Sequence, residues 1–120
     1  MDIGGAGPGA AGGPEAIRKA GLLKTLGPAS VDLGDVEVEP LDVSLEIVRG
    51  PDPESRRPEW PLIRNVCATL GEQVESIVAA GHLPIVLGGD HALAVGSMAG
   101  VARAFRESGR PVPGLIWFDA

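Results

Sequence analysis

Apolar residues recur at intervals of three or four in three stretches of the chain, which is the spacing of one face of an α-helix. The spacing predicts helices over residues 14–26, 61–80 and 92–105. Small residues in the third helix are expected to let it approach a sheet closely. The second helix has the longest apolar stripe, made of Leu62, Val66, Leu70, Val74, Ile77 and Val78.

Three other stretches have the patterns of β-strands. Residues 30–40 alternate apolar and acidic positions, which is typical of a strand near a sheet edge with one wet face. Residues 83–87 and 115–118 are short continuous apolar runs, as expected for strands buried on both faces. The order strand, helix, strand over residues 83–118 predicts a parallel pair in an α/β fold, with both C-terminal strand ends at one edge.

Length and composition fit a single globular unit over residues 1–120, with 44% apolar residues. Two irregular segments interrupt it. Residues 1–13 are rich in glycine, and residues 48–60 form a proline-rich loop.

Charge and sequence pattern exclude several classes of partner. The net charge of −6 and the absence of a basic stripe argue against nucleic acid. No apolar run approaches the roughly 20 residues of a membrane span, and no secretory signal is present. A single cysteine permits no internal disulfide, so we expect a cytoplasmic protein.

A histidine and an aspartate stand at the tips of the two apolar strands. His91 follows residues 83–87 after Gly88, Gly89 and Asp90, and Asp119 directly follows residues 115–118. Open parallel sheets bind ligands along this edge. Two polar groups at a buried edge are costly without a partner, and a divalent cation removes that cost. We therefore predict His91 and Asp119 as metal ligands. The structural alternative is a capping aspartate at position 90 beside a hydrogen-bonded core histidine.

Other candidate features favour structural interpretations. Cys67 borders the stripe of the second helix and is predicted to be a buried structural thiol, since no second cysteine or nearby histidine accompanies it. His82 is predicted to be a surface residue at a helix end. Residues 7–12 match the glycine pattern of a dinucleotide loop, but no buried strand precedes them, so nucleotide binding is a minor alternative.

The chain resembles the manganese-dependent ureohydrolases, and among them the arginases. The resemblance rests on residues 13–22, 87–101 and 114–120, and it spans nearly the whole chain. It is most specific at the Gly-Gly-Asp-His run ending at His91. It implies a three-layer αβα fold with a mostly parallel sheet, here extending to the strand that ends at Phe118. Residues 1–120 would be a partial, N-terminal arginase-like domain, cut at both ends.

The resemblance also implies a site and a reaction. His91 would bind the first of two Mn²⁺ ions, Asp119 would open the second metal-binding motif, and Asp90 would be an acceptor behind the ligands. The family converts L-arginine to urea and L-ornithine by attack of a metal-bridging hydroxide on the guanidinium carbon. Ala92 departs from the family pattern, since serine is usual there, which puts the tuning of the site in doubt.

The resemblance implies less for these 120 residues than for a complete enzyme. We expect no catalytic residue beyond the ligands named, no turnover by the 120 residues alone, and homo-oligomers (trimers or hexamers) for the full-length family. Agmatine or another guanidino compound is the alternative substrate. A non-catalytic remnant that associates with intact subunits is a further alternative.

Overall fold

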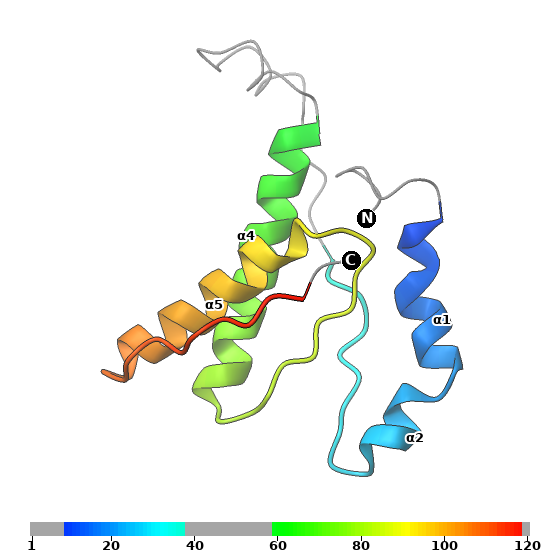
Figure 1. The fold of residues 1–120 in the computed structure, drawn as a ribbon, viewed down its shortest axis with the longest axis horizontal. Helices are drawn as coiled ribbons and strands as arrows, with labels where there is room; N and C mark the ends of the chain where they lie inside the picture. Colours follow the sequence, from blue (N-terminus) through cyan, green and yellow to red (C-terminus); the bar gives the residue numbers. More distant parts are fainter. Residues whose placement is uncertain (1–8, 38–58, 119–120) are drawn as a thin grey trace.

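A computed structural model describes residues 9–37 and 59–118. The regular structure in these ranges is helical (Figure 1). Helices α4 (Glu59–Ala79) and α5 (Leu93–Glu107) lie against each other. The 3₁₀ turn η1 (Ala10–Gly12) leads into α1 (Gly13–Lys19) and α2 (Leu22–Leu26), which stand apart from the pair, with extended segments between (Figure 1).

The helix predicted over residues 14–26 is two short helices, α1 and α2. Gly21 separates them with a φ of 95°. Its N–H donates to the carbonyl of Arg18 (3.0 Å), which closes α1. Only glycine reaches this left-handed conformation without a steric cost, so the apolar spacing continues across a point where the backbone turns.

The two long predicted helices are confirmed. Helix α4 begins at Glu59, two residues before the predicted start, and ends before Gly81, whose φ is 83°. The N–H of His82 donates to the Ile77 carbonyl and that of Gly81 to the Val78 carbonyl, both at 3.0 Å. These paired bonds form the Schellman motif that ends many helices.

The core lies between α4 and α5. Leu70, Val74 and Val78 of the predicted stripe are buried together with Ala104 of α5, and Val74 is only 1% exposed. Burial of a Val or Leu side chain stabilises a fold by about 1.5 to 3 kcal/mol. Partly buried apolar residues surround this cluster, namely Val36, Leu93, Val101 and Phe105.

Glycines bring the backbones of α4 and α5 into direct contact. A Cβ at Gly96 would lie 2.5 Å from the Cys67 carbonyl oxygen, and one at Gly100 would collide with the Gly71 carbonyl oxygen. The small residues of the third helix therefore face α4. The prediction that they face a sheet is wrong for the described residues, because α4 occupies that side of the helix.

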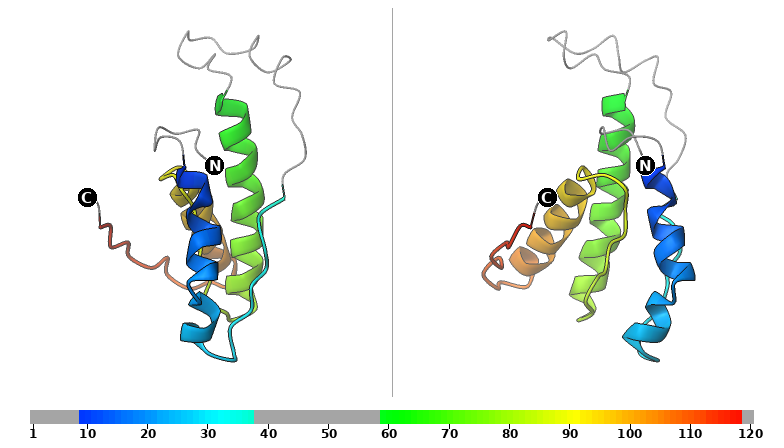
Figure 2. Two further views of the ribbon diagram at one scale, coloured as in Figure 1. Left: turned by 90° about the vertical axis from the view of Figure 1, so that its right-hand side faces the viewer. Right: turned by 45° about the vertical axis from the view of Figure 1, so that its right-hand side comes forward.

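Residues 83–87 and 115–118 are not strands in the structure, nor does any other described residue belong to one. Both stretches were predicted to be buried, yet Leu83 is 86% and Phe118 92% exposed. Figure 2 shows that residues 110–118 run back beside α5, away from residues 82–88. An apolar run becomes a strand only when a neighbouring strand accepts and donates its backbone hydrogen bonds, and no described segment does so here.

The edge strand predicted over residues 30–40 is also not formed in its described part, residues 30–37. Side-chain bonds shape this segment instead. The Gly34 N–H donates to Asp32 Oδ1 (2.9 Å), and the guanidinium of Arg18 forms ion pairs with Asp32 (3.0 Å) and Asp35 (2.6 Å). The hydrogen bond to Asp35 is the main cause of a raised pKa for the Arg18 guanidinium. The acidic positions of the alternating pattern thus bind α1.

The described helices include none long and apolar enough to cross a bilayer. Residues 1–8, 38–58 and Asp119–Ala120 lie outside the described part of the chain, and with them most of both segments predicted to be irregular.

The substitution Gly100→Ala is expected to lower the free energy of unfolding. Alanine stabilises a helix by about 1 kcal/mol relative to glycine, but overpacking costs about 1 to 3 kcal/mol. The added methyl group would meet the backbone of α4, which can shift only together with the rest of that helix. We expect a net loss of about 1 to 2 kcal/mol in urea unfolding followed by circular dichroism. Gly114→Ala is the control, since nothing lies within 4 Å of its added methyl group. Equal midpoints for the two variants would contradict the close helix contact.

Candidate metal centre at the start of helix α5

The predicted Asp90 and His91 lie in a turn that opens α5. The His91 carbonyl accepts from the Ala94 N–H (2.9 Å) and the Asp90 carbonyl from the Leu93 N–H (3.4 Å), so the helical bonding begins at these two residues. Figure 1 shows the turn joining the extended segment after α4 to the first turn of α5. The position of the predicted ligand therefore depends on how α5 starts.

Asp90 uses one carboxylate oxygen to hold the turn. Its Oδ1 accepts from the Ala92 N–H at 2.7 Å. Its Oδ2 is buried and has no hydrogen-bond partner among the described residues. A buried carboxylate oxygen without a partner is costly, and a cation or a donor from elsewhere in the protein removes that cost. The donor chemistry of this turn fits a divalent metal ion.

His91 is exposed and lies against an aromatic ring. Its imidazole meets the Trp117 indole edge to face, with ring centroids 5.7 Å apart and an interplanar angle of 82°. The structure thus brings the end of the segment 110–118 to the start of α5, although the two apolar runs are not paired as strands. Asp119, two positions after Trp117, lies outside the described residues, so its approach to His91 stays a prediction.

The ligands around this turn are few. In residues 9–37 and 59–118 no group of three or more His, Cys, Asp or Glu side chains is arranged to hold a metal ion. A stable transition-metal site needs about four or more donors. Asp90 and His91 can therefore supply only part of such a site.

Gly88 and Gly89 come just before this turn, and their backbones lie close to other parts of the chain. Neither has a positive φ. A Cβ at Gly89 would lie 2.5 Å from the carbonyl carbon and oxygen of Ala10, and one at Gly88 would overlap the Leu93 side chain. The glycines make room for η1 and for the first residue of α5, so the space beside them is filled by protein.

Cys67 is buried and His82 is exposed, as predicted. Cys67 is 7% exposed and carries a free thiol, which donates to the Ala92 carbonyl (3.1 Å). His82 is exposed at the end of α4. The contact from Cys67 to the turn was not foreseen, because 25 positions separate the partners and no local pattern links them.

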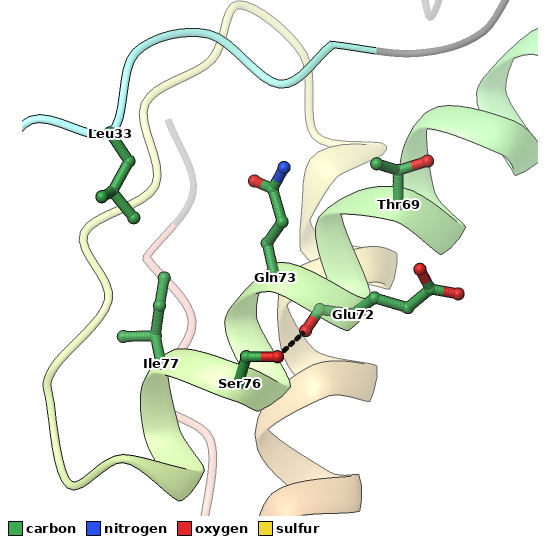
Figure 3. A pocket seen from close by; sticks show the side chains of 6 residues that line it. All are labelled: Leu33, Thr69, Glu72, Gln73, Ser76 and Ile77. Carbon is green, nitrogen blue, oxygen red and sulfur yellow. Dashed lines mark hydrogen bonds between the residues drawn. The ribbon is translucent and has the colours of Figure 1, made fainter.

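A second feature is a shallow hollow between α4 and residues 31–37. It has a volume of about 430 Å³, and Figure 3 shows its lining side chains: Leu33, Thr69, Glu72, Gln73, Ser76 and Ile77. The Ser76 hydroxyl donates to the Glu72 carbonyl within the helix (3.0 Å). Glu72 is its one titratable residue, so the hollow offers neither a nucleophile with a base nor a set of metal donors.

The geometry of the described residues does not by itself identify the family of the chain, but comparison with known proteins does. The model of the arginase family matches residues 1–120, the whole chain. The chain belongs to the arginase family. This membership confirms the resemblance carried by the Gly-Gly-Asp-His run.

Individual arginases support the same assignment. The chain is 32% identical to an arginase of Bacillus caldovelox over 120 residues, which is all of this chain and 38% of that protein. It is 37% identical to an arginase of Neurospora crassa (94% of this chain, 32% of that protein) and 35% identical to human arginase-1 (90% and 31%). The chain spans about a third of the length of these arginases. No solved structure matches it significantly.

The substitution Asp90→Ala is expected to destabilise the turn, because it leaves the Ala92 N–H without its acceptor. Loss of such a capping bond costs about 1 kcal/mol. Asp90→Asn keeps the oxygen that accepts this bond, so we expect its loss of stability to be less than half of the loss in Asp90→Ala. Thermal unfolding followed at 222 nm measures both. If both variants have the same melting temperature, below that of the parent protein, the hydrogen bond to Oδ1 is not what stabilises the turn.

Proposed function

We propose that this chain supplies the first part of the metal site of a manganese-dependent hydrolase that converts L-arginine to urea and L-ornithine. Membership of the arginase family carries the proposal. The start of α5 supports it, because the exposed His91 directly follows Asp90, whose Oδ2 is buried with no hydrogen-bond partner among the described residues. His91 and Asp119 are the proposed ligands, and Asp90 orients the turn behind them.

The reaction explains why such a site is needed. A guanidinium carbon is stabilised by resonance and resists attack by water. Mixed imidazole and carboxylate donors suit Mn²⁺. Manganese ions held by such donors would supply hydroxide at neutral pH. In this chain, Asp90 fixes the peptide that follows His91, and the Trp117 ring restricts the rotation of the imidazole.

Arginine is the substrate we propose, since the relatives quoted above are named arginase. Agmatine or another guanidino compound is the second candidate. In the whole protein we propose a three-layer αβα fold with a mostly parallel sheet, to which residues 83–87 and 115–118 contribute strands. We also propose that the whole protein is cytoplasmic and homo-oligomeric. The described residues hold no group of three or more metal donors, and we expect no urea release from L-arginine by the 120 residues alone.

The two histidines of the chain allow a matched test of the proposed ligand. Because His91 donates an imidazole nitrogen to the ion, His91→Ala is expected to weaken Mn²⁺ binding by the 120-residue chain at least about tenfold, or about 1.4 kcal/mol. His82→Ala is expected to change nothing, since His82 lies at the other end of the extended segment. Mn²⁺ binding is measured from the electron paramagnetic resonance signal of the free ion. Equal affinities of the two variants would exclude His91 as a ligand.

A chimera tests the proposed reaction. This chain replaces the matching third of the Bacillus caldovelox arginase, to which it aligns over its whole length. We expect the chimera to release urea from L-arginine with Mn²⁺. His91→Ala in the chimera should lower kcat/KM by about a hundredfold or more, because loss of a ligand exceeds the ~10 to 100-fold effect of losing an outer partner.

The control is His82→Ala in the same chimera, which should retain the parental rate. A folded, manganese-loaded chimera that releases no urea would contradict the proposed function. A chimera that hydrolyses agmatine but not L-arginine would favour the second candidate.

A further inference from the structure

The peptide groups that follow His91 are hydrogen-bonded on both sides of Ala92. The Ala92 N–H donates to Asp90 Oδ1 (2.7 Å), and the Ala92 carbonyl accepts from the Cys67 thiol (3.1 Å). The first bond is local and closes the turn. The second comes from α4, and it connects the turn to the most buried part of the molecule.

Cys67 itself is held firmly. It is 7% exposed, and it lies one turn before Leu70 of the core. Its backbone also lies against α5, because a Cβ at Gly96 would come within 2.5 Å of the Cys67 carbonyl oxygen and 3.0 Å of its Cα. The same residue therefore touches the first turn of α5 through its backbone, at Gly96, and through its side chain, at Ala92.

We propose that Cys67 is a positioning residue for His91, acting through the Ala92 carbonyl. The inference rests on the proposed role of His91 as a metal ligand. The thiol fixes the direction of the first turn of α5 relative to α4, and that turn determines where the imidazole points. A packing role alone would need only a small apolar side chain at this position, whereas the positioning role needs a hydrogen-bond donor.

Amide hydrogen exchange on the 120-residue chain separates these two roles. Cys67→Ala should speed exchange at residues 94–96 in the first turn of α5 roughly five- to tenfold, the effect of losing one hydrogen bond of about 1 kcal/mol. Exchange near the Arg103–Glu75 ion pair (2.6 Å), in the C-terminal parts of the two helices, should stay within twofold. Cys67→Ser keeps a donor and should restore most of the protection in the first turn.

A matched core variant shows what general destabilisation looks like. Val78→Ala removes buried volume near the far end of α4 and should speed exchange across both helices together. If Cys67→Ala gives this uniform pattern, or if Cys67→Ser protects the first turn no better than Cys67→Ala, the positioning role is wrong. Should Cys67→Ala not fold, the comparison of Cys67→Ser with the parent decides: the role requires the two to agree within twofold at residues 94–96.

Mn²⁺ gives the second measurement and distinguishes the inference from the proposed function. We expect Mn²⁺ to bind Cys67→Ala about three- to tenfold more weakly than the parent, and Cys67→Ser within twofold of the parent. If His91→Ala binds Mn²⁺ as the parent does, the proposed ligand is wrong. If His91 is required but Cys67→Ala binds Mn²⁺ unchanged, only the positioning role is wrong.

Discussion

The contact between the backbones of α4 and α5 is the constraint on which the rest of the structure depends. Gly96 and Gly100 allow it, because any Cβ there would meet the carbonyl oxygens of Cys67 and Gly71. With the helices this close, Val74 is almost fully buried and Cys67 reaches the Ala92 carbonyl. Dispersion contacts and hydrogen bonds of this kind are individually small, but here they all act between the same two helices.

The first turn of α5 is where helix packing sets the position of the proposed metal ligand. Asp90 and His91 come just before Ala92, the N-cap of α5, so their positions are set by where α5 begins. Asp90 stabilises the turn with one oxygen and keeps the other buried without a partner among the described residues. His91 stays at the surface beside Trp117. A rigid helix start that presents an exposed imidazole is a suitable support for one ligand of a larger site, which agrees with membership of the arginase family.

The sequence predicted the long helices better than the strands, for a physical reason. The stripe Leu70, Val74, Val78 buries itself against a neighbouring helix, and local signals such as Gly81 mark where α4 ends. Residues 83–87 and 115–118 need hydrogen-bond partners from other segments, and their apolar pattern cannot say whether those partners are present. The chain spans about a third of its relatives, and Leu83 and Phe118 are exposed here. The roles of Asp90, His91 and Asp119 are predictions from local sequence, whereas the Cys67 contact and the filling of the space at Gly89 depend on tertiary packing.

The central claim, that the imidazole of His91 binds manganese together with the residues around the start of α5, is tested most directly by pulsed electron paramagnetic resonance. The protein is labelled with ¹⁵N in histidine only and loaded with less than one equivalent of Mn²⁺. The account predicts hyperfine coupling to the ¹⁵N of one directly bound imidazole, present in His82→Ala and absent in His91→Ala. A spectrum with coupling to water protons alone, or one in which ¹⁵N coupling survives in His91→Ala, would contradict it.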